Sequence, residues 1–240
     1  MEVFFQRTLL LLGKEFMERL SSVKIIIFGL GGVGSWCAES LIRSGLLHLT
    51  IVDFDNICIT NINRQSMANS TTIGQKKTKV LKKQLLTINP EAQIMDLQMI
   101  YNSSNSDFFQ LNNYDYIIDA IDSVQNKVHL LQTATQTKAQ VFSSMGAALK
   151  ISPERIKVSE FWKVSGCPLA AALRKRFKKF GMPSKKFLCV YSDELLENKG
   201  QNENYETNTL INGSLVHITA IFGFTLAGLV LKDIENCSKL

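Results

Sequence analysis

The sequence lacks paired cysteines, and this excludes the commonest kind of structural zinc site. Its 240 residues hold five cysteines, and no two of them have the Cys-x-x-Cys spacing of zinc ligands. The three histidines form no ligand cluster either. An odd number of scattered cysteines is typical of a reducing compartment. We therefore expect a cytoplasmic protein that binds no zinc.

The sequence also lacks the features of a secretory signal. The first residues, MEVFFQRTLLLLGKEF, contain neither a basic leading region nor a small-residue cleavage site. Hydrophobic residues make up 45% of the chain and charged residues 20%, which is the composition of a soluble globular protein. A length of 240 residues suits one large domain.

Acidic residues are absent from one long segment. Residues 161–192 contain eight basic residues and no acidic one, while the whole chain has a net charge of +6, so the rest of the chain carries −2. A localised positive field attracts polyanions, and this segment therefore predicts a polyanionic partner. The alternative is the solvated charged face of a helix, but the lack of acids over 32 residues argues against it.

The order of the expected elements predicts the fold class. Strands are expected at residues 23–28, 47–53, 93–99, 114–120, 139–144 and 155–161, and helices at 6–20, 33–44, 74–88, 124–138, 167–180 and 213–234. Such alternation indicates an α/β, Rossmann-like fold with a mostly parallel sheet and helices on both faces. We expect one domain, with a nucleotide-binding core at 1–148 and a C-terminal extension at 149–240 for substrate binding and the dimer interface. A polar loop near 193–212 is expected to be mobile.

The last expected helix is unusually apolar. The segment from Thr207 to Leu231 contains no charged residue and is long enough to span a bilayer. The segment also contains His217, two glycines and several Ser and Thr residues, and it follows a soluble α/β unit. We therefore favour a buried core or dimer-interface helix. Length and hydrophobicity alone leave peripheral membrane contact open.

A glycine-rich turn follows the first expected strand. The apolar run Ile25–Phe28 leads into Gly29, Gly31 and Gly34, where a helix is expected to begin. Glycines let the turn tighten and let a phosphate or ribose approach the backbone. Asp53 lies 19 residues after Gly34, which is the reach expected for binding ribose hydroxyls. The turn predicts a nucleotide-binding site. The alternatives are a tight turn that binds no ligand and a site for a nicotinamide cofactor.

Charged residues further along the chain favour a triphosphate over a dinucleotide. Arg64 and Lys77 flank the segment after the second expected strand, and Asp122 follows the strand expected at 114–120. Ligands bind at the carboxyl ends of strands in open α/β sheets, so these side chains are expected to meet in one crevice. Cations neutralise phosphates, and a free carboxylate holds Mg²⁺. Singly, each residue could be a surface charge, and Asp122 could cap a helix.

These residues carry a family resemblance. The motifs Gly29-x-Gly31-Gly32-x-Gly34, Asp53-x-Asp55, Asn61-x-x-Arg64-Gln65, Gly74-Gln75-x-Lys77 and Asp119-x-x-Asp122 resemble the adenylation core of ubiquitin-activating enzymes and their bacterial relatives. The resemblance implies that these residues bind ATP, with Asp53 on the ribose, Arg64 and Lys77 on the phosphates, Asn61 facing the nucleotide and Asp122 on Mg²⁺. It also implies a homodimer in which Arg7 reaches the γ-phosphate from the partner subunit.

The C-terminal third resembles one branch of that family. The molybdopterin and thiazole adenylyltransferases usually carry paired Cys-x-x-Cys ligands, which are missing here. The segments Cys167-Pro168-Leu169-Ala170, Val190-Tyr191-Ser192 and Thr219-Ala220-Ile221-Phe222-Gly223 instead resemble bacterial tRNA threonylcarbamoyladenosine dehydratases. Cys167 departs from the Asp usual in that family. The resemblance implies tRNA binding, and the basic helix agrees through Arg174, Lys175, Arg176, Lys178 and Lys179.

The expected activity is adenylation of a carboxylate on tRNA, followed by cyclisation of threonylcarbamoyladenosine. No enzyme nucleophile is needed, because the attack is intramolecular. The first alternative is an adenylyltransferase for a ubiquitin-like or sulfur-carrier protein, with Cys167 and Cys189 as candidate acceptor thiols. The second is a redox or nucleotide-sensing Rossmann protein. Sulfur-relay proteins stay open as further partners, and the ring form of the product is not determined by the sequence.

Overall fold

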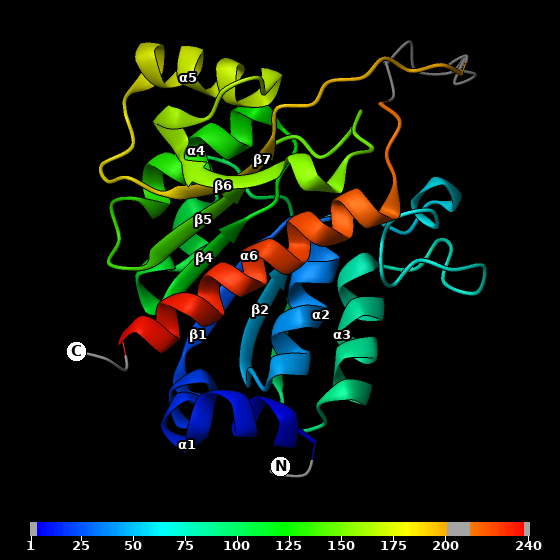
Figure 1. The fold of residues 1–240 in the computed structure, drawn as a ribbon, viewed down its shortest axis with the longest axis vertical. Helices are drawn as coiled ribbons and strands as arrows, with labels where there is room; N and C mark the ends of the chain where they lie inside the picture. The colour runs from blue at the N-terminus through cyan, green and yellow to red at the C-terminus, as the bar shows by residue number, and fades with distance from the viewer. Residues whose placement is uncertain (1–3, 201–211, 238–240) are drawn as a thin grey trace.

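The computed structural model describes residues 4–200 and 212–237, which form a seven-stranded sheet in the order β3-β2-β1-β4-β5-β7-β6 (Figure 1). Neighbouring strands are parallel except β6, which is antiparallel to β7. The strands are β1 Lys24–Phe28, β2 His48–Val52, β3 Gln93–Leu97, β4 Tyr116–Asp119, β5 Gln140–Ser144, β6 Ile156–Glu160 and β7 Leu188–Ser192. The expected mostly parallel α/β sheet is confirmed.

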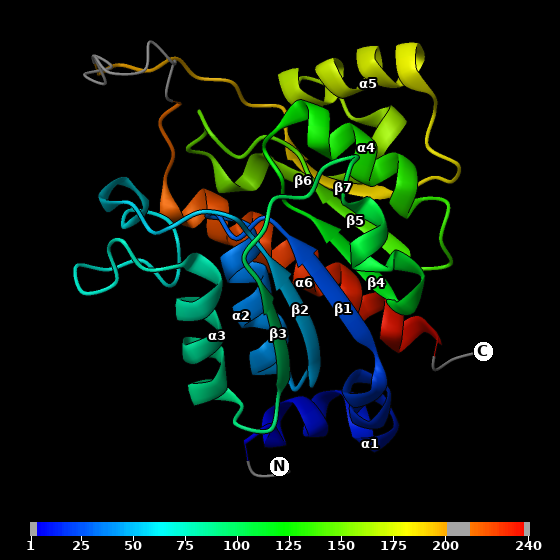
Figure 2. The same ribbon diagram turned by 180° about the vertical axis from the view of Figure 1, so that it is seen from behind.

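Helices cover both faces of this sheet. They are α1 Gln6–Ser22, α2 Gly34–Ser44, α3 Lys77–Ile88, α4 Val124–Ala134, α5 Pro168–Phe180 and α6 Val216–Cys237. Figures 1 and 2 show α2, α3 and α6 on one face and α4 with α5 on the other, while α1 lies below the ends where the strands begin. The opposite end of the sheet, where the parallel strands finish, is left for the loops.

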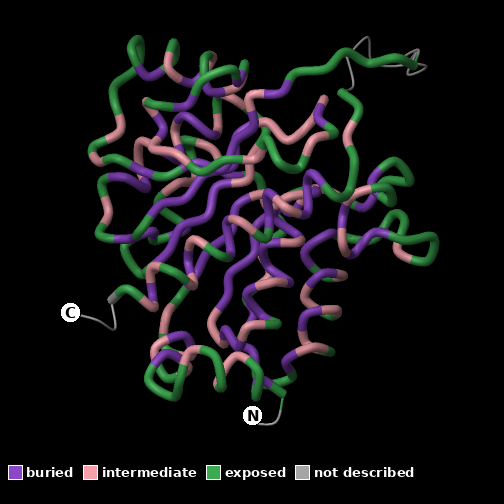
Figure 3. The backbone as a smooth tube through the Cα atoms, viewed as in Figure 1, coloured by how far each residue is buried: buried purple, intermediate pink, exposed green. Residues whose placement is uncertain are grey.

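Residues 25–28 of the central strand β1 are all apolar because both faces of the strand are buried. Ile25 and Ile27 belong to a core with α2, α3 and α6, whereas Ile26 and Phe28 belong to a second core with α4 and α5. All four side chains are fully buried. Figure 3 shows this burial concentrated in the sheet, with exposed residues on the outer loops and helices. The continuous run of residues 25–28 is therefore a strand between two helical layers.

The sheet continues beyond residue 148 through a strand that the sequence pattern did not reveal. Leu188–Ser192 forms β7, which pairs in parallel with β5 through Ser143 and Cys189 and antiparallel with β6. The run is short and lies at the end of the basic segment, shortly after Lys185 and Lys186, so it has little signal of its own. Part of the loop expected at 193–212 lies outside the described residues.

Several predicted helix boundaries were too wide. The helix expected from residue 74 begins at Lys77, because Gly74 has φ +80° and Lys76 forms a β-bridge with Asn56. The helix expected at 124–138 ends at Ala134, and the one expected at 213–234 begins only at Val216.

The apolar helix α6 is long and apolar enough to cross a membrane, and half of that apolar stretch is buried within the protein. Its inner side chains join the core shared with α2. Gly223 permits close packing there, because a Cβ at this position would lie 2.5 Å from the Val33 carbonyl oxygen. The described part of α6 is thus a partly buried helix packed on the sheet.

Candidate nucleotide-binding site

A cavity of about 630 Å³ opens at the carboxyl ends of the parallel strands. It lies where β1 is flanked by β2 on one side and β4 on the other, which is the switch point at which open α/β sheets bind ligands. Ten of the predicted site residues line it: Gly29, Gly31, Gly32, Asp53, Asp55, Asn61, Arg64, Gln65, Lys77 and Asp122. The structure therefore brings together side chains that are far apart in the sequence.

The glycine turn shapes the floor of this cavity. Gly29 has φ +88°, and a Cβ there would lie 2.6 Å from the Ala120 carbonyl oxygen, so only glycine fits. Gly34 does not line the cavity; a Cβ on it would meet the Gly29 carbonyl oxygen at 1.8 Å. Its role is to close the turn. No side chain caps the start of α2, so backbone N–H groups there are available to an anion.

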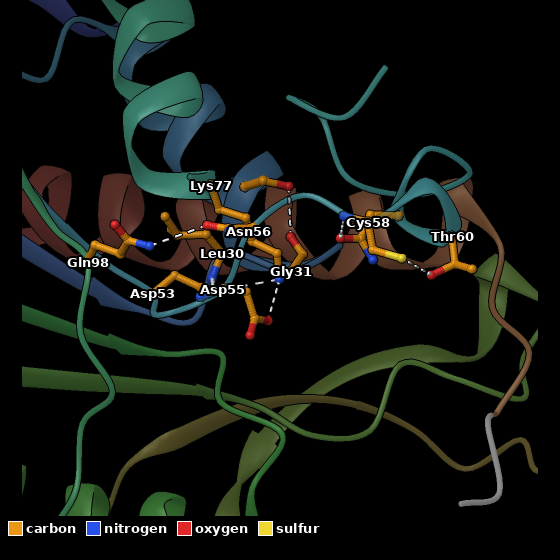
Figure 4. A network of polar contacts seen from close by, with 11 residues as sticks. Leu30, Gly31, Asp53, Asp55, Asn56, Cys58, Thr60, Lys77 and Gln98 are labelled. Carbon is orange, nitrogen blue, oxygen red and sulfur yellow. Dashed lines mark hydrogen bonds and ion pairs between the residues drawn. The ribbon is translucent and has the colours of Figure 1, made fainter. Parts of the chain in front are cut away.

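Asp53 at the end of β2 is buried and shapes the loop beside the turn (Figure 4). Its Oδ2 accepts a hydrogen bond from the Leu30 N–H at 2.6 Å, and its Oδ1 accepts one from the Asp55 N–H at 2.9 Å. Burial raises the pKa of Asp53, and the nearby Lys77 ammonium opposes that rise. The carboxylate thus links the glycine turn to the segment that follows β2.

Lys77 is a buried cation at the mouth of the cavity. It is the first residue of α3, and its Nζ lies 2.6 Å from Asp55 Oδ2 and 3.9 Å from Asp53 Oδ1. Only 5% of the residue is exposed, whereas the Asp55 side chain is 43% exposed. A buried ammonium needs anionic partners, and a phosphate in the cavity would be a strong one.

Arg64 lies on the cavity wall beside the glycine turn, since its Cγ is 3.1 Å from where a Cβ on Gly32 would be. Its Nη1 donates to the Thr60 carbonyl oxygen at 2.8 Å and to Asn63 Oδ1 at 3.0 Å. Burial lowers the pKa of Arg64, and the charge of Asp122 opposes this, so the two charged groups are near enough to interact. The remaining guanidinium donors suit a phosphate.

Two amides complete this wall. Asn61 Oδ1 accepts the Cys58 N–H at 3.1 Å, which leaves the Asn61 NH₂ group to face the cavity. Gln65 is 5% exposed, and its Oε1 is buried without a hydrogen-bond partner among the described residues. Both residues line the cavity, which places amide groups beside Arg64.

Other cavity residues were not expected from the sequence. The segment after β5, residues 144–148, lines the cavity, as do Thr219 of α6 and the apolar residues Met99, Ile100 and Tyr101. The rule that ligands sit at strand ends could have identified residues 144–148. Thr219 gives no such signal, because its position depends on α6 crossing α2.

The structure places Arg7 away from this cavity. Arg7 is an exposed residue in the first turn of α1, at the end of the sheet where the strands begin. The cavity is at the other end. Within one chain, Arg7 and the nucleotide-binding residues are therefore not brought together.

The basic helix α5 begins near the cavity, since Leu169 in its first turn is a lining residue. Lys175, Arg176, Lys178 and Lys179 are exposed, as a binding surface requires. Arg174 differs from them: its Nη1 donates to the Val164 carbonyl oxygen at 2.8 Å, and its guanidinium lies over the Phe161 ring. Arg174 thus packs α5 against the sheet.

Cys167 precedes α5 and is buried. Its neighbourhood includes the buried Lys150, whose Nζ donates to the Glu194 carbonyl oxygen. Burial lowers the pKa of Lys150, and the neighbouring Cys167 thiol and Glu194 oppose this. The thiol of Cys167 thus lies near a buried lysine.

Comparisons with known proteins agree with this geometry. The ThiF family model matches residues 5–239. A tRNA threonylcarbamoyladenosine dehydratase of Bacillus subtilis is 37% identical over 190 residues, which cover 79% of this chain and 74% of that protein. One of Haemophilus influenzae is 36% identical over 231 residues, covering 92% and 88%. The crystal structure of the E. coli tRNA N6-threonylcarbamoyladenosine dehydratase in complex with ATP superimposes with a TM-score of 0.89 at 31% identity, covering 99% and 96%.

Proposed function

Because this chain belongs to the ThiF family, we propose that it is an ATP-dependent dehydratase that cyclises N6-threonylcarbamoyladenosine in tRNA. The observation that carries the proposal is one cavity holding the glycine turn, Asp53, Arg64 and Lys77, in a chain similar to these dehydratases over nearly its whole length. The charged groups bind ATP, and the similarity identifies the substrate class. Fold alone would not assign the substrate.

The reaction has two steps. The threonyl carboxylate oxygen attacks the α-phosphorus of ATP, a new P–O bond forms, and pyrophosphate leaves. A nitrogen or the oxygen of the carbamoyl group then attacks the activated carbonyl carbon, the group loses one N–H proton, and the C–O bond to AMP breaks, so AMP leaves. The net result is loss of one water from the nucleoside at the cost of ATP becoming AMP and pyrophosphate. Because the second attack is intramolecular, positioning supplies much of the rate acceleration.

The chain's own residues contribute mainly by charge stabilisation. Lys77 and Arg64 neutralise the phosphates as negative charge develops on the departing pyrophosphate. Asp53 accepts hydrogen bonds from the ribose hydroxyls, and Asn61 and Gln65 hydrogen-bond the nucleotide. None of the described cysteines lines the cavity, which agrees with a reaction that needs no thiol intermediate.

Asp122 is suited to a Mg²⁺ that travels with ATP. No group of three or more potential metal ligands occurs among residues 4–200 and 212–237, so a protein-only metal cage is not formed there. Mg²⁺ is commonly held by one or two carboxylates together with substrate phosphates and water. Asp122 is an exposed carboxylate at the cavity, near Arg64. Bound there, the ion would neutralise phosphate charge.

A homodimer would make Arg7 part of the site. Arg7 lies at the far end of its own sheet, so it can reach a cavity only in a second copy of the chain. Subunit complementation tests this: Arg7→Ala and Lys77→Met are each inactive alone, and mixing them restores activity through sites that contain neither substitution. If the mixture stays inactive while the two chains form mixed dimers, Arg7 does not act across subunits.

Helix α5 supplies the surface for tRNA. Its exposed cations lie in the C-terminal half of the helix and its first turn reaches the cavity, so an RNA backbone lying along α5 would bring a base toward the ATP site. We also place the enzyme in the cytoplasm, where its substrate is made and used. Cell fractionation checks this, and recovery with membranes would instead indicate that α6 contacts lipid.

Nucleoside analysis of tRNA from a strain lacking this gene tests the proposed function. Loss of the cyclic nucleoside, with accumulation of the open threonylcarbamoyl form, is the expected result. An unchanged nucleoside profile would contradict it. A small acidic protein that is adenylated at its C-terminus by the purified enzyme would favour the adenylyltransferase alternative.

A further inference from the structure

A fully buried ion pair lies directly beneath the Asp122 loop. Asp119 is the last residue of β4, and Lys127 is in the first turn of α4; neither side chain is exposed. Lys127 Nζ lies 2.7 Å from Asp119 Oδ2. Figure 2 shows α4 lying against the face of β4 and β5. Removing two charges from water is costly, so the burial of this pair is weak evidence that it stabilises the fold.

The pair holds one residue of the loop by both of its backbone polar groups. Asp119 Oδ1 accepts the Ile121 N–H at 3.1 Å, and Lys127 Nζ donates to the Ile121 carbonyl oxygen at 3.1 Å. Ile121 is followed at once by Asp122, and both line the cavity. The ion pair therefore fixes the backbone from which the Asp122 carboxylate projects.

Two further observations set Lys127 apart from a residue that merely stabilises α4. A cation in the first turn of a helix is unfavourable, because the N-terminal end carries the positive end of the helix dipole. Asp119 Oδ2 also accepts a hydrogen bond from Ser143 Oγ at 2.6 Å, and Ser143 stands opposite Asp119 on β5. The pair thus ties together two strand ends whose following loops both line the cavity.

We propose that Lys127 is a positioning residue: through its pairing with Asp119 and its hydrogen bond to Ile121, it holds the Asp122 carboxylate in place for Mg²⁺ bound to ATP. This deepens the proposed function and rests on its ATP site. Lys127 does not touch the nucleotide. Its loss should weaken the part of ATP binding that depends on Mg²⁺ and leave the rest unchanged.

The test measures ATP affinity by calorimetry without tRNA, once with Mg²⁺ and once with EDTA. The main variant is the double substitution Asp119→Asn with Lys127→Met, which removes both charges and leaves no unpaired ion in the core. Its affinity in EDTA should match the wild type. The gain in affinity on adding Mg²⁺ should fall about tenfold, as is typical when support behind a metal ligand is lost.

Lys185→Met is the matched control. Lys185 also donates to backbone carbonyl oxygens, those of Thr137 and Ala139, but it does not line the cavity. Its loss should lower the melting temperature and leave the Mg²⁺ gain unchanged. A folded double variant with the wild-type Mg²⁺ gain overturns the proposal, and so does an equal loss of that gain in Lys185→Met.

If the double variant does not fold, the single variant Lys127→Arg tests the proposal instead. It keeps a cation between Asp119 and the Ile121 carbonyl, so it should fold and retain most of the Mg²⁺ gain. A folded Lys127→Arg protein without that gain overturns the proposal, and so does a wild-type protein that gains nothing from Mg²⁺. Because no tRNA is present, a wrong substrate assignment would leave these binding results intact and show up only as missing turnover.

Discussion

Lys77 Nζ lies 2.6 Å from Asp55 Oδ2, so a buried cation on α3 is paired with a half-exposed carboxylate at the mouth of the cavity. A phosphate that binds Lys77 must compete with Asp55 for it. The pair keeps the ammonium in position, while the exposed partner can turn toward solvent. The ion pair with Asp55 therefore holds Lys77 in position and still leaves its ammonium able to bind a phosphate.

Lys77→Met should weaken ATP binding by about 1.5–3 kcal/mol, or roughly 10- to 100-fold, because a charge-assisted hydrogen bond to phosphate is lost. Calorimetric titration with ATP measures the change. Lys82→Met is the matched control: Lys82 is on the same helix and pairs with Asp96 at 2.7 Å, but it does not line the cavity. Equal losses in both variants would contradict the assignment of Lys77.

Two glycines of the turn should respond oppositely to alanine. A Cβ on Gly31 meets no atom within 4 Å but projects at the cavity, whereas a Cβ on Gly34 overlaps the Gly29 carbonyl oxygen. Gly31→Ala should keep its stability within about 0.5 kcal/mol of the wild type and lose ATP affinity. Gly34→Ala should lose about 1–3 kcal/mol or more of unfolding free energy. Urea unfolding and ATP titration separate the two effects, and the reverse pattern would refute this account of the turn.

Cys58 should be the most reactive of the four described cysteines whose side chains are placed. It is exposed, whereas Cys37, Cys167 and Cys189 are buried. Hydrogen bonding from Thr60 lowers the pKa of Cys58, so its thiolate forms at lower pH than that of a free cysteine. Alkylation with iodoacetamide, followed by peptide mass analysis, should show a midpoint for Cys58 below that of the urea-unfolded chain. A midpoint equal to or above that of the unfolded chain would contradict the hydrogen bond.

Removing charge from α5 should weaken tRNA binding and its salt dependence. Lys178 and Lys179 are exposed, and if both contact phosphates, the double change to Gln should reduce the slope of log K against log salt by roughly 1.4–1.8. The control replaces Lys79 and Lys83, two exposed lysines on α3. Filter binding at several salt concentrations gives the slopes. An unchanged slope for the α5 variant, or an equal fall of the slope in the control, would indicate that tRNA binds a surface other than α5.

The residues that could be predicted are those whose role is encoded in local spacing. The glycine turn, Asp53 and Lys77 lie at or near strand ends and helix starts, so alternation of strands and helices was enough to bring them to one edge of the sheet. The two-sided burial of residues 25–28 likewise followed from an uninterrupted apolar run.

What could not be predicted depends on contacts between distant segments. Thr219 reaches the cavity because α6 crosses α2, and its Oγ1 lies 3.0 Å from where a Cβ on Gly32 would be. The ion pair of Asp119 and Lys127 needs a turn between β4 and α4 that buries both charges. Residue propensities for helix, strand or turn do not indicate this burial. Arg174 belongs to the basic run predicted to bind tRNA, and its hydrogen bond to the Val164 carbonyl oxygen is visible only in three dimensions.

The most direct test of the central claim is pyrophosphate release by the purified enzyme with ATP, Mg²⁺ and purified tRNA. With tRNA that carries threonylcarbamoyladenosine, release should match the cyclic nucleoside formed one for one, and the Lys77→Met enzyme should be strongly impaired. With the same tRNA lacking the modification, release should be absent. Pyrophosphate release that is independent of the modification, or that requires a small carrier protein instead of tRNA, would contradict the account.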